Sequence, residues 1–316
     1  MKLSIIIPSY NGRYLLEKNL PAVFRALEYI KRLGLPAEGQ AFIEIVVIDD
    51  GSVDGTQGWL KRTYPEIRVI RHFNPMRFGK SCNDGVAAAA GEIVALLNND
   101  VQPKADFLTP LMAHFTDEKV FAVGCKEVNF ENGKKIFGGR GEMDFRRGLA
   151  VHWRPKDQDT SKTMWVSGGS AAFRRDIWLK LGGFDKLFYP AYEEDRDLSW
   201  QALKSGYVLR FEPRAVVIHH HEATNKPVFG RNLIEIMSLK NQLLFVWKNI
   251  SQPKLLAEHL FWLPYHLTVT SVRTGGAFLP AFIWALWQLP QAIVSRIKAS
   301  KHWRVADEEI FAVVDE

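Results

Sequence analysis

The sequence lacks the cysteines and the leading apolar segment that are typical of secreted proteins. Its 316 residues include only two cysteines, Cys82 and Cys125, which are too few for a disulfide framework and indicate a reducing compartment. The apolar run within Met1–Pro8 is shorter than the apolar region of a signal peptide. We therefore expect the N-terminus to lie in the cytoplasm.

The sequence also lacks the two glycine-rich motifs that most often bind nucleotides. Its first strand-to-helix turn reads PSYNG, at the place where a dinucleotide-binding dehydrogenase carries G-x-G-x-x-G. No G-x-x-x-x-G-K-[ST] occurs, which argues against a P-loop NTPase. A nucleotidyltransferase is disfavoured as well, because its first loop would be rich in glycine and basic residues.

The composition is that of a globular protein whose charge is unevenly spread. Apolar residues make up 47% of the chain and charged residues 24%. Residues 226–304 hold ten Lys and Arg against two acids, and they contain five of the ten tryptophans, Trp247, Trp262, Trp284, Trp287 and Trp303. No recognised nucleic-acid motif accompanies this stretch, so we expect no nucleic-acid partner and favour contact with a membrane surface.

The first part of the chain alternates between strand and helix patterns. Strands are predicted near residues 3–10, 43–52, 67–72, 93–97 and 120–128, with helices near 14–33, from 54, 80–91 and 107–115. This order predicts an α/β fold with a mostly parallel sheet flanked by helices. Residues 129–164 are irregular and are predicted to form a long surface loop or a small hairpin. The alternation ends near residue 226, so we expect an α/β domain over 1–225 and a helical region over 226–316.

Polar residues follow three of the predicted strands at their carboxyl ends, where open α/β sheets bind ligands. The three groups are Pro8-Ser9-Tyr10-Asn11, Asp49-Asp50-Gly51-Ser52 and Asn98-Asn99-Asp100. The carboxylates can accept hydrogen bonds from a base or a ribose, and Asp100 can ligate a hard divalent cation. Turn and helix-cap chemistry would explain the same residue types.

Two later segments carry further candidates for chemistry. Glu193, Glu194, Asp195 and Asp197 crowd the start of a predicted helix. The helix dipole favours acids there, and crowding can also raise the pKa of one of them and make it a general base. The strand over AVVIHHH ends in His219, His220 and His221, any of which is a candidate second metal ligand.

Seven motifs occur in an order that resembles the family-2 glycosyltransferases with the GT-A fold, and the rhamnosyltransferase and galactofuranosyltransferase type in particular. They are IIIPSYN, VVIDDGSVDGT, GEIVALLNND, GGSAAFRR, GGFD, YEEDRDLSWQALKSGY and AVVIHH, and the resemblance covers residues 1–225. It implies an inverting enzyme that uses a nucleotide-sugar donor (UDP-, dTDP- or GDP-sugar) with Mg²⁺ or Mn²⁺.

The resemblance also implies roles for individual residues. Asn98-Asn99-Asp100 occupies the place of the family's D-x-D motif, although its first acid is an asparagine here. Asp195 matches the catalytic base, and Asp100 and His219 match the metal ligands. The residues expected around the donor are Pro8, Ser9, Tyr10, Asn11, Asp49, Asp50, Ser52, Lys80, Asn98, Asn99, Asp100, Gly168, Gly169 and Glu194.

Within this family, the sequence is compatible with several acceptors. We expect transfer to a hydroxyl of a saccharide acceptor, carried on a polyprenyl diphosphate, in the synthesis of a cell-surface polysaccharide. A polyprenyl-phosphate sugar synthase and a non-catalytic membrane subunit that binds a sugar nucleotide or a polysaccharide are the alternatives. A processive synthase is disfavoured, because WQALKSGY does not carry the QxxRW motif.

Residues 274–295 form a run of 22 residues without a charge, about the length that crosses a bilayer. Glycine, proline and glutamine interrupt the run, and basic residues flank it on both sides. We therefore expect a segment that lies on the cytoplasmic face of the membrane, although a single span has the required length. The alternative is a soluble helical subdomain that packs its tryptophans into a core.

Overall fold

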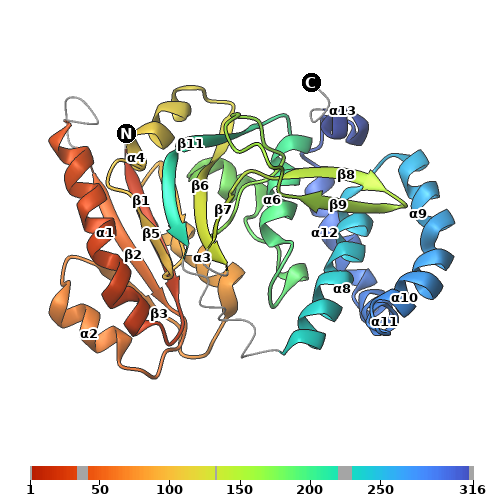
Figure 1. The fold of residues 1–316 in the computed structure, drawn as a ribbon, viewed down its shortest axis with the longest axis horizontal. Coiled ribbons are helices and arrows are strands. Elements are labelled where there is room, and N and C mark those ends of the chain that lie inside the picture. Colours follow the sequence, from red (N-terminus) through yellow and green to blue (C-terminus); the bar gives the residue numbers. More distant parts are fainter. Residues whose placement is uncertain (1, 34–41, 132–133, 220–229, 313–316) are drawn as a thin grey trace.

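The computed structural model describes residues 2–33, 42–131, 134–219 and 230–312. Its main sheet has nine strands, which are β1 (Leu3–Ser9), β2 (Ile43–Asp49), β3 (Arg68–Arg71), β4 (Ile93–Leu97), β5 (Val101–Pro103), β6 (Val120–Glu131), β7 (Lys134–Gly138), β10 (Ser170–Arg174) and β11 (Val208–His219). Their order is β3-β2-β1-β4-β10-β6-β11-β5, with β7 paired to β6 (Figure 1).

Helices cover both faces of this sheet because successive side chains of each strand point to opposite faces. Ile5 and Ile7 of β1 belong to one apolar core, with α1 (Arg13–Arg32), α2 (Thr56–Thr63) and α4 (Leu108–Ala113). Ile6 belongs to the other core, with α3 (Arg77–Ala88), α5 (Arg175–Leu181) and α6 (Glu194–Lys204). Helix α3 packs so closely that a Cβ on Gly85 would lie 2.4 Å from Ile6.

The predicted, mostly parallel α/β sheet flanked by helices is confirmed, and three of its strands run antiparallel to their neighbours. The strands from β3 to β4 are parallel, as are β6 and β11. Strand β10 runs antiparallel between β4 and β6, and β5 and β7 are antiparallel edge strands. Neither strand β10 nor its antiparallel direction was predicted from sequence.

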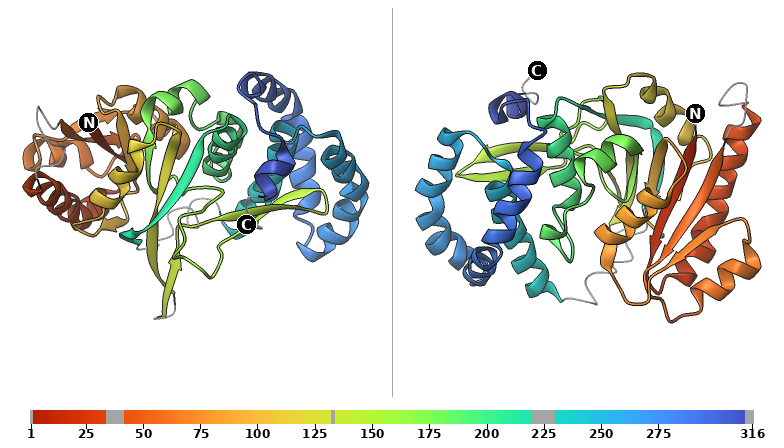
Figure 2. Two further views of the ribbon diagram at one scale, coloured as in Figure 1. Left: turned by 90° about the horizontal axis from the view of Figure 1, so that it is seen from above. Right: turned by 180° about the vertical axis from the view of Figure 1, so that it is seen from behind.

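The irregular segment contains a small hairpin, as one of the two interpretations predicted. After β7, strands β8 (Glu142–Arg146) and β9 (Leu149–Trp153) pair with each other and with no strand of the main sheet. This hairpin extends toward the C-terminal helices (Figures 1 and 2).

The C-terminal region is a set of helices that packs around this hairpin and against α6. The helices are α8 (Arg231–Asn249), α9 (Pro253–Tyr265), the π-helix η3 (His266–Thr270), α10 (Ser271–Arg273), α11 (Phe278–Trp287), α12 (Leu289–Ser300) and α13 (Asp307–Ala312). Their shared apolar core includes Leu149 of the hairpin, Trp200 of α6, Phe245 of α8 and Phe278 of α11. The predicted boundary at residues 225 and 226 lies outside the described residues.

In the part of the chain that the structure describes, no single helix is long and apolar enough to cross a bilayer. Helices α11 and α12 have the required length and composition only together, and they are bent by 64° where they meet. Of the five C-terminal tryptophans, Trp287 is exposed while the other four are partly buried by neighbouring groups. The expectation that these rings lie at headgroup depth stays a prediction, as does the alternative of a soluble helical subdomain.

Candidate active site

The carboxyl ends of β1, β2 and β4 meet, and hydrogen bonds join the polar residues that follow them. The backbone N–H of Asn11 donates to Ser52 Oγ over 2.9 Å. Asn99 Nδ2 donates to Ser9 Oγ over 3.0 Å. Pro8 and Tyr10 flank Ser9 at the same edge, and Tyr10 is exposed there. The structure thus brings together three groups that are up to 90 residues apart in sequence.

The carboxylates of Asp49 and Asp50 are buried and have structural partners. Asp50 accepts hydrogen bonds from the backbone N–H groups of residues 76–77, each over 2.8 Å, and contacts His72 Nδ1 at 2.7 Å. Asp49 Oδ1 accepts from the backbone N–H of Ser52 over 3.0 Å. Turn and cap chemistry accounts for Asp50 and for Oδ1 of Asp49. Among the described residues Asp49 Oδ2 has no hydrogen-bond partner and lies 4.0 Å from Arg71 Nε, and contact of these side chains with a nucleoside stays a prediction.

A chain of charged side chains continues from Asp50 to Lys80. His72 Nε2 lies 3.0 Å from Asp84 Oδ2, and Lys80 forms an ion pair with Asp84. Lys80 and Glu194 both line a small cavity between α3 and residues 184–190. His72 and Asp84 were not identified from the sequence. The available signal was the position of His72 just after β3.

Asp100 and His219, the two predicted metal ligands, face each other across the β5–β11 pairing. The antiparallel register places His219 opposite Val101, the residue after Asp100. His219 Nε2 lies 3.2 Å from Asp100 Oδ1, and both residues are buried. Burial opposes a charge on His219, but the hydrogen bond and the charge of Asp100 outweigh it, so the pKa of His219 lies above its usual value.

This pair fits a divalent cation that shares its coordination with a substrate. One carboxylate oxygen and one imidazole nitrogen converge from two strands, and Mn²⁺ and Mg²⁺ complete such sites with phosphate oxygens and water. Among the described residues, no group of three or more His, Cys, Asp or Glu is placed to hold a metal. His220 and His221 lie outside the described residues.

The loop before β10 joins the end of β4 to the start of α6. The backbone N–H of Asn98 donates to the Gly169 carbonyl over 2.8 Å. A Cβ on Gly169 would lie 2.5 Å from Asn98 Nδ2, so the close approach requires glycine. On its other side, the N–H of Gly168 lies 3.4 Å from Asp195 Oδ2. Asp195 is therefore joined to the strand end that carries Asn98, Asn99 and Asp100.

The acids around Asp195 have perturbed pKa values, and burial is the largest cause. Burial and the nearby charge of Asp195 raise the pKa of Glu194 from 4.5 to about 8. Burial also raises the pKa of Glu193 to about 7, against the effect of its ion pair with Arg196. Burial raises the pKa of Asp197 despite an ion pair with Lys248. Crowding of the acids raises the pKa of Glu194, as predicted, and desolvation by burial contributes more to this rise than the neighbouring charge does.

The sequence of residues 4–182 matches the family model described as Glycosyl transferase family 2. The chain belongs to glycosyltransferase family 2. The expected family is therefore confirmed over more than half of the chain.

Two relatives from Mycobacterium tuberculosis show how far this family-2 chain resembles curated proteins. It is 28% identical over 180 residues to the pre-mycofactocin glycosyltransferase, covering 57% of this chain and 38% of the relative. It is 26% identical over 207 residues to N-acetylglucosaminyl-diphospho-decaprenol L-rhamnosyltransferase, covering 56% of this chain and 66% of that protein. The matched part thus spans less than two thirds of either relative.

The solved mannosyltransferase PcManGT from Pyrobaculum calidifontis, in complex with GDP-Man and Mn²⁺, has a similar fold. The TM-score is 0.55 at 20% sequence identity, and the match covers 99% of this chain and 78% of the other. Identity at this level shows the fold alone, and it confirms the expected GT-A fold of this glycosyltransferase.

Two buried polar residues next to the loop before β10 and to His219 were missed by the analysis of the sequence. Glu127 on β6 accepts a hydrogen bond from Ser170 Oγ over 2.6 Å, and Asn129 is paired with His219 in the β6–β11 register. Both lie within β6, two residues apart, so they share one face of the sheet. Two polar residues at that spacing inside an apolar strand were the signal that could have identified them.

Proposed function

We propose that this chain is an inverting, metal-dependent glycosyltransferase that moves a sugar from a nucleotide-diphosphate donor to a hydroxyl of a lipid-linked saccharide. The proposal rests on one observation. Gly168 contacts Asp195, and the adjacent Gly169 contacts Asn98. Asn98 lies two residues before Asp100, which pairs with His219. A base for an acceptor and a site for a diphosphate are therefore neighbours.

In this proposal Asp195 takes the proton from the acceptor hydroxyl as the oxygen attacks the anomeric carbon. Its Oδ1 accepts from the backbone N–H of Arg196 over 2.8 Å and its Oδ2 from Gly168, which fixes the direction of the carboxylate. One displacement inverts the anomeric configuration, so no second carboxylate is needed as a nucleophile. Asp100 and His219 would hold the cation, which when bound supplies positive charge to the departing diphosphate.

The same geometry favours a hydroxyl acceptor over the alternatives. A polyprenyl phosphate is ionised before it attacks and does not need a base, so Asp195 would have no role in a polyprenyl-phosphate sugar synthase. A non-catalytic binding subunit would not need a carboxylate held by two backbone N–H groups beside the donor loop. The name of the rhamnosyltransferase relative, which contains a diphospho-decaprenol, supports a lipid-linked saccharide.

We further propose that an exposed apolar face of the C-terminal helices lies on the cytoplasmic surface of the membrane. Its residues are Leu260 and Phe261 of α9, Leu279, Ile283, Leu286 and Trp287 of α11, and Ile293, Val294 and Ile297 of α12. Exposed Arg273, Lys298 and Lys301 lie on the same helices or next to them and suit anionic lipid. These exposed apolar residues come from three helices of this region, and exposed apolar patches mark sites of membrane or protein contact.

A donor screen tests the proposed function. The purified protein is mixed with UDP-, dTDP- and GDP-sugars, Mn²⁺ or Mg²⁺, and a saccharide on a polyprenyl diphosphate, and products are identified by mass and by anomeric NMR. We expect one donor to give a glycoside of inverted configuration. A retained configuration, transfer to polyprenyl phosphate alone, or no transfer from any donor would contradict the proposal.

A further inference from the structure

The segment that leads into Glu194 and Asp195 has a strained backbone. Tyr192 and Glu193 both have φ of +74°, in the left-handed region that residues other than glycine rarely adopt. Two such residues in succession persist only where the surrounding structure holds them. The residues that hold this segment therefore determine where α6 begins.

Asn241 of α8 is one of these residues. It is fully buried, and its Nδ2 donates to the carbonyl oxygens of Ala191 and Tyr192, each over 2.9 Å, and lies 3.3 Å from that of Phe188. Three carbonyl oxygens around one atom require a donor there, so the orientation of the amide follows from its neighbours. In the described part of the chain, Asn241 Oδ1 has no hydrogen-bond partner. The side chain therefore acts on this loop as a donor.

The neighbouring Lys240 extends the same attachment to α11. Its Nζ donates to Gln288 Oε1 over 2.9 Å, lies 3.4 Å from the Tyr189 carbonyl oxygen, and is 4.5 Å from the ring centroid of Trp284. Burial lowers the pKa of Lys240 to about 8. Helix α8 thus contacts the loop through two adjacent side chains, and Lys240 also contacts Trp284 of α11 and Gln288 at its end.

A third attachment from α8 lies beyond Asp195. Lys248 Nζ contacts Asp185 Oδ2 at 2.8 Å and Asp197 Oδ2 at 2.7 Å, and Asn249 Nδ2 donates to Asp197 Oδ1 over 2.9 Å. Asp197 is in the first turn of α6, two residues after Asp195. Helix α8 therefore holds the chain on both sides of Asp195.

We propose that Asn241 is a positioning residue for sugar transfer. Its amide holds residues 188–192, which lead into the left-handed pair Tyr192 and Glu193, and this path places Asp195 next to Gly168. The inference rests on the proposed function, because it assigns Asn241 a part in the reaction for which Asp195 is the base. Asn241 does not contact the reacting atoms.

The test compares Asn241→Ala with Gln242→Ala on the same helix. Gln242 Nε2 also donates to a backbone carbonyl, that of Ala150 in the hairpin, over 3.3 Å. We expect Asn241→Ala to lower kcat by about 10- to 100-fold, the scale of a misplacement of about 1 Å, with an unchanged KM for the donor. Amide hydrogen exchange should become faster in residues 188–197 for this variant and in the hairpin for Gln242→Ala, which should keep its kcat.

A double variant separates positioning from a general loss of stability. Glycine adopts a positive φ without strain, so Tyr192→Gly should restore part of the kcat that Asn241→Ala loses. If Asn241→Ala does not fold, Asn241→Ser retains one donor and should show the same changes to a smaller degree. Unchanged exchange in residues 188–197, or faster exchange there with kcat within about twofold of wild type, would overturn the inference. The exchange is measured without substrate, so a failure of the donor screen contradicts the proposed function separately.

Discussion

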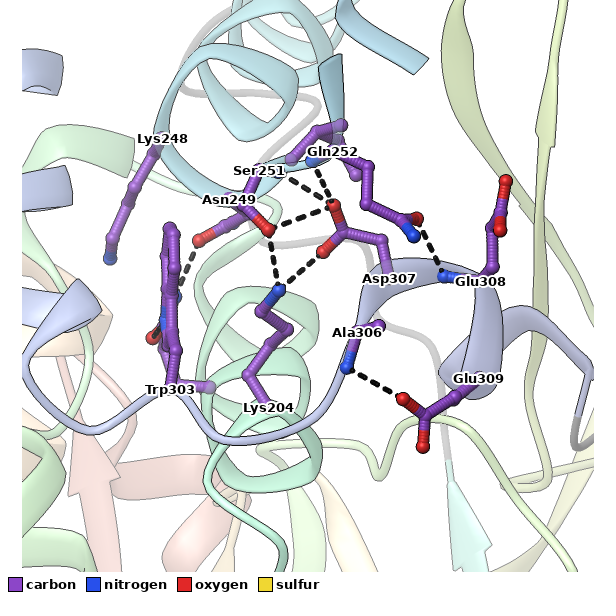
Figure 3. Close-up of polar contacts among 12 residues, drawn as sticks. Lys204, Lys248, Asn249, Ser251, Gln252, Trp303, Ala306, Asp307, Glu308 and Glu309 are labelled. Atoms are coloured by element: carbon purple, nitrogen blue, oxygen red, sulfur yellow. Dashed lines mark hydrogen bonds and ion pairs between the residues drawn. The ribbon is translucent and has the colours of Figure 1, made fainter. Parts of the chain in front are cut away.

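Lys204 on α6 and Asp307 on α13 form a buried ion pair, with 2.5 Å between Nζ and Oδ1 (Figure 3). Their side chains are 2% and 0% exposed. Asp307 Oδ2 also accepts from the backbone N–H groups of Ser251 and Gln252. The last described helix thus closes onto the helix that begins with Glu194 and Asp195, so the C-terminal helices form part of the structure around the candidate base.

Removal of one partner of this pair should destabilise the whole protein. Asp307→Asn leaves the buried Lys204 without its counter-charge, and we expect a loss of about 3–5 kcal/mol in the free energy of unfolding. The matched control is Glu308→Gln, which removes the exposed pair with Lys254 and should cost about 0–1 kcal/mol. Urea denaturation of both variants gives the comparison. Equal losses would show that the buried pair contributes no more than a surface pair.

Stability should fall with rising pH because of Glu194. Its pKa in the folded protein, about 8, lies above its ordinary value of 4.5. The folded state therefore binds a proton more tightly than the unfolded state, and the corresponding stability is lost as pH rises from 4.5 through 8. Glu193, whose pKa is raised to about 7, adds to the same dependence, so Glu194→Gln should reduce it between pH 5 and 9, while the exposed Glu66→Gln should leave it unchanged. Parallel curves for wild type and Glu194→Gln in denaturant titrations would contradict the burial of an ionisable Glu194.

Cation binding should depend on Asp100 and His219 together. EDTA should abolish transfer and Mn²⁺ or Mg²⁺ should restore it. Asp100→Ala and His219→Ala should each weaken the binding of Mn²⁺ with a nucleoside diphosphate in calorimetry, because each removes one of two protein ligands. His114→Ala removes another histidine–carboxylate pair, with 2.9 Å to Glu212, and should have no effect on this binding. Full transfer in the presence of chelator would exclude the proposed role of the cation.

Membrane contact should depend on α11. Leu286 and Leu179 are leucines with the same exposure, 45%, on α11 and α5. Leu286→Glu should lower binding to anionic liposomes by about tenfold, since it removes the burial of one leucine in the bilayer. Leu179→Glu should bind as the wild type does. Equal sedimentation of both variants with liposomes would contradict the proposed membrane face.

Sequence periodicity was enough to predict the parts of the fold whose pattern is local. The apolar strands β1, β2 and β4 and the polar residues after them were recognised, because burial on both faces gives continuous apolar runs. Strand β10 was missed because SAAFR follows a glycine pair and resembles a loop. Its antiparallel direction depends on pairing with β4 and β6, which are distant in sequence.

Long-range contacts explain what was missed in the site. The residues alone offered three histidines as the second metal ligand beside Asp100, and only the family resemblance selected His219, since 118 residues separate the two in sequence. Asn241 holds a loop about 50 residues before it, and nothing in the pattern of α8 shows which buried polar residue does so. In the C-terminal region, the interruptions at Gly275, Gly276 and Pro290 were visible in the sequence, and Pro290 lies in the first turn of α12, next to the 64° bend between α11 and α12.

The turnover of Asp195→Asn tests the central claim most directly. The amide keeps the shape of the side chain but cannot accept the acceptor's proton, so kcat should fall by at least about 100-fold. The KM of the donor should change little, because Asp195 is not among the residues expected around the donor. The amide keeps one acceptor oxygen, so at most one of the two hydrogen bonds from backbone N–H groups is lost, and the free energy of unfolding is measured alongside. The measurement is steady-state transfer with the donor found by the screen, for the wild type and for Asp195→Asn at equal folded concentration. Retention of most of the wild-type kcat by Asp195→Asn would contradict the account, because Asp195 would then only shape the start of α6.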